Sequence, residues 1–248
     1  MRGQIDLFQP VLKALEDAFR EVETKVVPPV RRPWGNSFVF RYTEQTIQQA
    51  IVQKLARMIS GLHAIKTLLN CGLFQEQGMV QRAVAEIDED ILFLSLAIIH
   101  NDVTALHTEF LRHFYAEEFA DPSDIVGSHT SRGMSKREKI RGYIHAKGLA
   151  GANAARAARI DKVLTKAYSG YIHGASPHIM DMYGGQPARF DINGSTKGAR
   201  HESHHRDAAN YFYRAALTMA AAAKAFGDES LFATVRASAD EFGERMKA

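Results

Sequence analysis

The densest group of chemically reactive residues lies in the segment YSGYIHGASPHIMDMYGG, residues 168–185. Ser169 and His173 are four residues apart, so they share one face if this segment is helical. Gly174 follows at once and places His173 at a helix end, where the helix dipole favours a protonated imidazole. A general acid or base needs a pKa near neutrality, so His173 is the preferred candidate for acid–base catalysis, with Ser169 beside it.

The same part of the chain offers polar side chains that could bind a ligand. These candidate ligand-binding residues are Lys166, Tyr168, His178, Asp181 and Tyr183. A structural alternative stays open, in which the histidine at the helix end only caps its own helix and the neighbouring glycines only shape a turn.

A second candidate group is the pair Arg82 and Glu86, which stand four residues apart among apolar neighbours. One interpretation is an intrahelical salt bridge at a contact between helices, since ion pairs at this spacing are common. In the other interpretation Glu86 holds Arg82 toward a central cleft, where the guanidinium binds an anion. The spacing alone is compatible with both, and we assign the two residues to the candidate catalytic group.

The sequence HESHH contains the pattern H-E-x-x-H at His201, Glu202 and His205. On a helix the two histidines could bind zinc while the glutamate acts as a general base. The flanking residues Arg200 and Arg206 are charged, whereas zinc-protease helices are usually apolar here, and no third ligand follows at a familiar spacing. The alternative is a solvated helix start, and we expect no cofactor, with zinc as the secondary possibility.

Apolar residues at a three-to-four spacing predict helices over most of the chain. Thr43 is the expected N-cap of the second helix and Gly72 its expected stop, while Ser135 to Glu138 matches a capping box that should begin another helix. The expected helices cover residues 5–24, 44–70, 75–99, a stretch ending near 119, a helix beginning near 135, and residues 150–174, 202–226 and 229–246.

Two segments interrupt this helical pattern. Pro28, Pro29 and Pro33 predict an extended connector, followed at residues 37–42 by a short strand or an arm that lies on the core. Paired glycines and Asn193–Gly194 predict a β-hairpin or ordered loop near residues 177–195, and this is the only hairpin signal that we identify.

The expected fold is therefore an all-α helical bundle with one small hairpin or loop insertion. We expect a single domain over residues 1–248. Its expected parts are an N-terminal helix and Pro-rich arm (1–43), a helical core (44–175), the hairpin or loop (176–199) and C-terminal helices (200–248).

Composition limits the functional classes. The 248 residues carry a net charge of only +3, which is too little for a polycationic nucleic-acid-binding protein. The single cysteine, Cys71, excludes an internal disulfide and suits a reducing compartment. The longest apolar run, residues 91–99, is too short to cross a bilayer, and the N-terminus lacks the apolar segment of a signal peptide. We therefore expect a cytoplasmic protein without a membrane partner.

The pattern R-x-x-x-E at Arg82 and Glu86, followed by S-x-x-x-H-G at Ser169, His173 and Gly174, resembles an uncharacterised bacterial group of helical proteins. The resemblance covers roughly residues 45–185 and extends distantly to HEPN-like helical bundles, many of which are metal-independent RNases of toxin, antiviral and stress systems. That signature has an arginine several residues before the histidine, whereas Lys166 stands in this window here.

The resemblance implies that His173 activates a ribose hydroxyl or protonates a leaving oxygen, while Arg82 or Lys166 stabilises the phosphate. It also implies RNA or a nucleotide as ligand and a symmetric homodimer. Two other hypotheses remain: a non-catalytic binding or scaffold protein, and a metal-dependent hydrolase that uses the H-E-x-x-H residues. Whether the chain is an enzyme stays open at this point.

Overall fold

A computed structural model describes residues 6–121, 123–124, 126–130, 132–148, 163, 166–196 and 198–247. It confirms the all-α bundle with a small hairpin. The helices are α1 (Phe8–Glu23), α2 (Ile47–Cys71), α3 (Phe74–Ile99), α4 (Ala105–Tyr115), α5 (Arg137–Lys147), α7 (Ser176–Met180), α8 (Ala199–Ala225) and α9 (Glu229–Arg245), and residues 166–172 are also helical. The strands form two antiparallel hairpins, β1 (Val30–Trp34) with β2 (Ser37–Arg41) and β3 (Tyr183–Gly184) with β4 (Arg189–Phe190).

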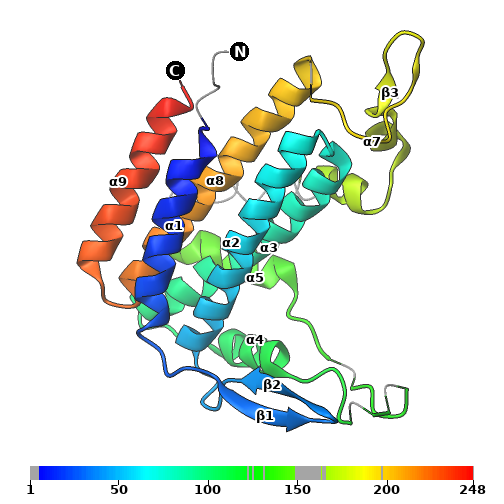
Figure 1. Ribbon diagram of the computed structural model, residues 1–248. Helices are drawn as coiled ribbons and strands as arrows, with labels where there is room; N and C mark the ends of the chain where they lie inside the picture. Colours follow the sequence, from blue (N-terminus) through cyan, green and yellow to red (C-terminus); the bar gives the residue numbers. More distant parts are fainter. Residues whose placement is uncertain are drawn as a thin grey trace.

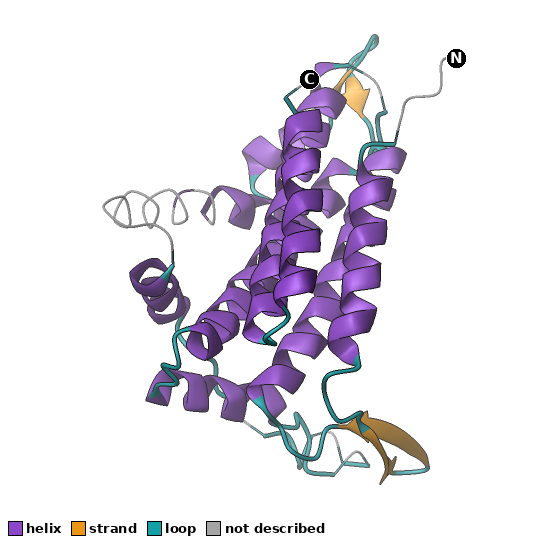
Figure 2. Cartoon of the chain, turned by 90° about the vertical axis from the view of Figure 1, so that its left-hand side faces the viewer, coloured by secondary structure: helices purple, strands orange, loops and turns teal. Residues whose placement is uncertain are grey.

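The long helices α1, α2, α3, α8 and α9 run alongside one another and enclose the core (Figure 1). The β1–β2 hairpin and α4 lie at one end of this bundle, whereas α7 and the β3–β4 hairpin lie at the other end. Figure 2 shows the same separation of the two hairpins from a second direction. None of the helices in the described part of the chain is long and apolar enough to cross a membrane.

The core consists of the apolar stripes that the spacing predicts. The α8 helix contributes mainly alanines, and such small side chains allow neighbouring helices to approach closely. The larger fully buried side chains come from α1, α2, α3 and α8 and include Leu12, Leu15, Ile51, Leu55, Met58, Leu62, Ile65, Phe93, Leu94 and Phe212.

The ends of the helices correct two predictions. Gly72 ends α2 in the left-handed conformation (φ 70°), as expected, but the N-cap is Thr46 rather than Thr43. Thr46 forms a capping box with Gln49, and Gln45 with its φ of 54° turns the chain just before it, so the helix cannot begin earlier. The helix expected at Ser135 begins instead at Arg137, and its N-cap Lys136 makes no side-chain capping bond.

The extended segments also differ in part from expectation. The β3–β4 hairpin confirms the prediction near residues 177–195. The expectation that this was the only hairpin is wrong, because the Pro-rich arm forms β1 and pairs with β2 around Gly35, whose φ is 56°. A two-stranded ribbon consists of edge strands only, so it tolerates Pro33. The helix expected to reach residue 119 ends at Tyr115, and the one expected over 150–174 lies partly outside the described residues.

Two buried carboxylates on α3 connect it to its neighbours. The first is Asp88, whose Oδ1 accepts a hydrogen bond from the hydroxyl of Thr218 at 2.5 Å. Its Oδ2 lies 3.1 Å from Nη2 of Arg214, which also belongs to α8. Because a buried carboxylate must be matched by donors, these contacts fix the position of α8 along α3.

The second buried carboxylate is Asp90. Its Oδ2 lies 2.7 Å from Nζ of Lys54 on α2, and its Oδ1 lies 2.5 Å from Nη1 of Arg137 on α5. The neighbouring Glu89 pairs with Arg141 of α5 at 2.9 Å. The carboxylates of α3 thus form ion pairs with cationic side chains of α2, α5 and α8, the helices that surround it.

We predict that Asp90→Ala lowers the free energy of unfolding by about 3 kcal/mol, because Lys54 and Arg137 would lose their shared carboxylate in a partly buried position. Urea unfolding at constant pH measures this loss. Asp17→Ala is the matched control, since Asp17 pairs with Lys13 on the exposed surface of α1 and should contribute less than about 0.5 kcal/mol. Equal losses for the two variants would contradict the assignment.

Candidate ligand-binding and acid–base site

The candidate catalytic histidine of the sequence lies at a helix end, as predicted. The helix of residues 166–172 stops at Gly174, whose φ is 59°. The amide of Ala175 donates to the carbonyl of Gly170 at 2.9 Å, which is the Schellman arrangement, and His173 occupies the C-cap position. Pro177 then falls in the first turn of α7.

Two glycines leave room for the aromatic side chains of this segment. A Cβ atom on Gly78 of α3 would stand only 2.6 Å from the ring of Tyr171, and a Cβ on Gly170 would overlap the imidazole of His178. The Tyr171 and His178 rings meet edge to face, with 4.4 Å between their centroids. In addition, the side-chain amide of Gln75 donates to the His178 carbonyl at 2.6 Å. Residues 166–180 are thereby held against the first half of α3.

A half-buried hydroxyl–carboxylate contact joins this segment to α8. The Tyr168 hydroxyl donates a hydrogen bond to the carboxylate of Asp207. Burial raises the pKa of Tyr168, and it raises the pKa of Tyr211, which packs edge-on to Tyr168, to about 12. Both phenols are therefore protonated and uncharged at neutral pH. The positive charges of Arg214 and Arg82 partly oppose the rise at Tyr211.

The pair Arg82 and Glu86 forms the intrahelical ion pair expected from its spacing, with 2.5 Å between Nη2 and Oε1. The Arg82 side chain is only 14% exposed, and Glu86 also lies 4.0 Å from Arg137 of α5. This geometry matches the interpretation as a salt bridge at a helix contact. The Arg82 charge nevertheless acts on Tyr211, whose ring packs against that of Tyr168.

His173 stands apart from this group. Its side chain and that of Lys166 are exposed, while Ser169 is half-buried. Within the described ranges, no hydrogen bond, ion pair or ring contact links the His173 side chain to Arg82, Ser169 or Lys166. The catalytic roles expected for these residues stay predictions, and the fold places other groups next to Tyr168.

The three histidines at the start of α8 pack against aromatic rings. The imidazole of His204 stacks on Phe74 with 4.4 Å between centroids, and that of His205 lies 4.8 Å from the Phe8 ring. His201 is 6.0 Å from Phe74, and Glu202 is exposed. Among the residues that the structure describes, no three His, Cys, Asp or Glu side chains are grouped so that they could hold a metal ion.

His204 is a site residue that the sequence analysis missed. Burial lowers its pKa, and the positive charges of His201 and Arg200 act in the same direction, while the carboxylates of Asp207 and Asp181 oppose them. A lowered pKa leaves the imidazole neutral at neutral pH, so it can accept a proton. The H-E-x-x-H pattern selects His201, Glu202 and His205 and leaves out His204. The stacking of His204 on Phe74 joins residues far apart in the chain, so no local sequence pattern indicates it.

His204 lines a polar pocket of about 460 Å³ between α8 and residues 171–181. Two segments that are separate in the sequence meet here, the one predicted to bind a ligand and the H-E-x-x-H helix. We call this hollow the polar pocket. Its lining consists of Tyr171, Asp181, Arg200, Ser203, His204, Arg206, Asp207 and Asn210.

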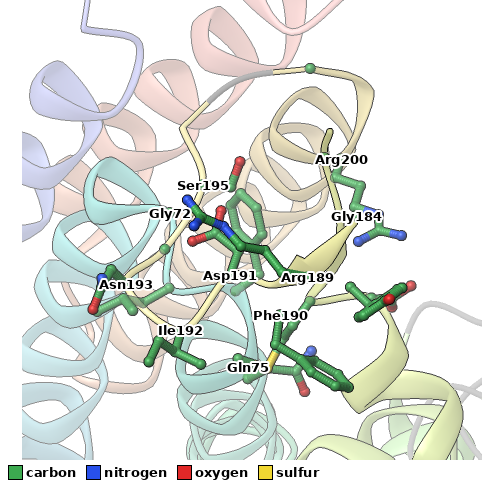
Figure 3. Close-up of a pocket in the computed structure, with 18 of the residues that line it drawn as sticks. Gly72, Gln75, Gly184, Arg189, Phe190, Asp191, Ile192, Asn193, Ser195 and Arg200 are labelled. Atoms are coloured by element: carbon green, nitrogen blue, oxygen red, sulfur yellow. The ribbon is translucent and has the colours of Figure 1, made fainter. Parts of the chain in front are cut away.

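A larger groove of about 910 Å³ adjoins the polar pocket and shares Asp181 and Arg200 with it. We call it the hairpin groove. Figure 3 shows residues 189–195 beside Gly72, with Arg200 extending from the start of α8. Tyr183, one of the predicted ligand-binding residues, and Phe190 add aromatic rings to its lining, and their centroids lie 5.0 Å apart.

Close backbone contact holds the hairpin groove in shape. The amide of Ser195 donates to the carbonyl of Gly72 at 3.1 Å. A Cβ atom on Gly72 would overlap the Ser195 backbone, and one on Gly194 would overlap the carbonyl oxygen of Cys71. Both glycines also have positive φ, so this junction between the loop and the α2–α3 corner requires glycine at both positions.

No protein-family model, curated protein or solved structure matches this chain. The resemblance to HEPN-like proteins therefore rests on the short sequence motifs.

We predict that the His204 imidazole titrates below the ordinary histidine pKa of 6.5. Asp207→Asn should lower the midpoint further, because the carboxylate raises it. Since the folded-state pKa is lowered, the stabilising contribution of neutral His204 is complete above pH 6.5 and is lost as the pH falls below it. A histidine-labelled NMR titration, assigned with His204→Asn, measures the midpoint, and a value at or above 6.5 would refute the assignment.

Proposed function

We propose that this chain is a HEPN-like protein that binds RNA or a nucleotide at the start of α8, with metal-independent RNA cleavage as its chemistry. The observation that supports it best is that Arg200 and Arg206 line the polar pocket together with the half-buried His204, whose pKa is lowered. An anion-binding group and a proton acceptor are two of the components that phosphodiester cleavage without metal uses.

The arginines of the polar pocket and the hairpin groove suit a phosphate ligand, while Asp181 and Asp207 add two carboxylates to the lining of the polar pocket. Arg189, Arg200 and Arg206 form no ion pair within the described part of the chain, so their guanidinium groups can pair with phosphate oxygens. The first turn of α8 follows Gly198, which provides no side-chain cap, so backbone amides there are open to an anion. The exposed ring of Phe190 offers a surface on which a base can stack.

In this proposal His204 takes the proton of the ribose 2′-hydroxyl as its oxygen attacks the phosphorus. The P–O5′ bond then breaks, which leaves a 2′,3′-cyclic phosphate, and a solvent proton is transferred to the leaving 5′ oxygen. The two arginines of the polar pocket stabilise the negative charge of the transition state. His173 is the alternative general base that the sequence motifs indicate. A cytoplasmic location, which the free Cys71 suits, and a homodimer that joins two such sites belong to the same proposal.

The second candidate function is a non-catalytic binding or scaffold protein. The observation that favours it is the mostly buried, mutually paired Arg82 and Glu86, which are unavailable to a ligand in this conformation. The metal-dependent hydrolase using His201, Glu202 and His205 is the third candidate, and it needs a further ligand from outside the described residues.

The test measures binding and cleavage of labelled RNA in the presence of a chelator. Arg200→Gln combined with Arg206→Gln should weaken binding at least about tenfold, because two phosphate contacts are removed. His204→Asn should abolish cleavage while RNA still binds. Arg236→Gln is the charge-matched control, since Arg236 pairs with Asp240 on the exposed face of α9, and it should leave both properties unchanged.

Other outcomes separate the alternatives. Cleavage that is lost in His173→Ala but kept in His204→Asn would transfer the acid–base role to His173. Absence of RNA and nucleotide binding by the wild-type protein would contradict the proposal and support the scaffold function. Cleavage that stops with chelator and returns with zinc would support the H-E-x-x-H residues as the site.

A further inference from the structure

The β1–β2 hairpin has one face that is exposed throughout. Arg31 pairs in register with Phe40, and Pro33 with Phe38, so these four side chains project from the same side of the ribbon. All four residues are exposed, Phe38 by 42% and Phe40 by 58%. We call this set of four residues the outer face.

The opposite face of the hairpin is fixed to the rest of the protein. Arg41 forms a bidentate salt bridge with Glu117, in which Nε lies 2.5 Å from Oε1 and Nη2 lies 2.9 Å from Oε2. Its guanidinium also lies 5.7 Å from the centre of the Trp34 ring. The hydrogen bond from Arg41, together with its charge, lowers the pKa of Glu117 and keeps the pair ionised. Because the inner face is held in this way, the outer face stays directed away from the bundle.

The side chains of the outer face are arranged as an aromatic and cationic surface. The Phe38 and Phe40 rings meet at 88° with 5.6 Å between their centroids. The Arg31 guanidinium lies 3.7 Å from the centre of the Phe38 ring. Adjacent exposed aromatic rings are a feature of binding surfaces.

The charges indicate which ligand fits. Arg31 forms no ion pair with a carboxylate in the described ranges, and its guanidinium lies over the Phe38 ring. Arg32 pairs in register with Val39, so it lies on the opposite face, where its charge acts on Glu117. A purely apolar protein partner would bury the Arg31 charge without compensation. A single-stranded nucleic acid instead offers planar bases for the rings and a phosphate for the guanidinium group.

We propose that the outer face is a binding surface for single-stranded RNA. The choice of RNA over DNA rests on the proposed function. The surface is separate from the site at α8, because the two lie at opposite ends of the bundle (Figures 1 and 2). The α2 helix, which runs between these ends, has 25 residues and is about 37 Å long.

The experiment titrates short oligouridine into the full chain and follows the fluorescence of Trp34, the single tryptophan, which belongs to the same hairpin. Oligouridine should change this fluorescence, and Phe38→Ala combined with Phe40→Ala should weaken binding at least about tenfold through lost stacking. Phe38→Tyr with Phe40→Tyr should retain affinity, because the rings remain. Met134→Ala, an exposed apolar residue outside the hairpin, is the control and should have no effect.

Arg31→Gln tests the electrostatic part of the surface. The slope of log affinity against log salt should fall by about 0.7, which corresponds to one single-strand contact. Arg200→Gln with Arg206→Gln should leave the Trp34 response intact, so a failure of the α8 site and a failure of the hairpin are distinguished.

Three results would overturn the proposal. One is an unchanged affinity and Trp34 response in the double alanine variant. Another is equal affinity for oligouridine and its deoxy counterpart, which would remove the assignment to RNA. The third is a wild-type dimer that the double alanine variant loses, because the outer face would then be a contact between two copies of the chain.

Discussion

The arrangement of the bundle depends on the two buried carboxylates of α3. Asp88 and Asp90 sit in the low-dielectric interior, where an unmatched charge is strongly unfavourable. Each is met by groups from other helices, Asp88 by α8 and Asp90 by α2 and α5. Because a hydrogen bond tolerates only a small error in distance, these contacts allow one rotation and one height of each helix about α3. Apolar packing alone is less selective.

The same helix also positions the candidate site. Toward its N-terminal end, Gly78 receives the Tyr171 ring, and the side-chain amide of Gln77 donates to the His204 carbonyl at 3.2 Å. The start of α8 and the segment of residues 166–180 are thus placed by contacts to one continuous helix. The neutral state of His204 and the position of Asp207 beside Tyr168 are consequences of this packing.

Local patterns in the sequence were sufficient where the determining interaction is itself local. The apolar spacing located the long helices, Gly72 located the end of α2, and the glycines near residue 190 located the β3–β4 hairpin. Interactions between distant segments have no such pattern. The strand β1 depends on pairing with β2 despite Pro33, and the partly buried position of His204 depends on stacking against Phe74, which lies far away in the chain.

Photocross-linking of a thiouridine-substituted oligoribonucleotide to the wild-type protein, followed by mass spectrometry of its peptides, tests most directly whether RNA lies at the start of α8. Cross-links should occur in the peptides that carry Tyr183, Phe190 and His204, because these line the hairpin groove and the polar pocket. Cross-links confined to α1 and α9, or their absence while RNA is bound, would contradict the proposed site.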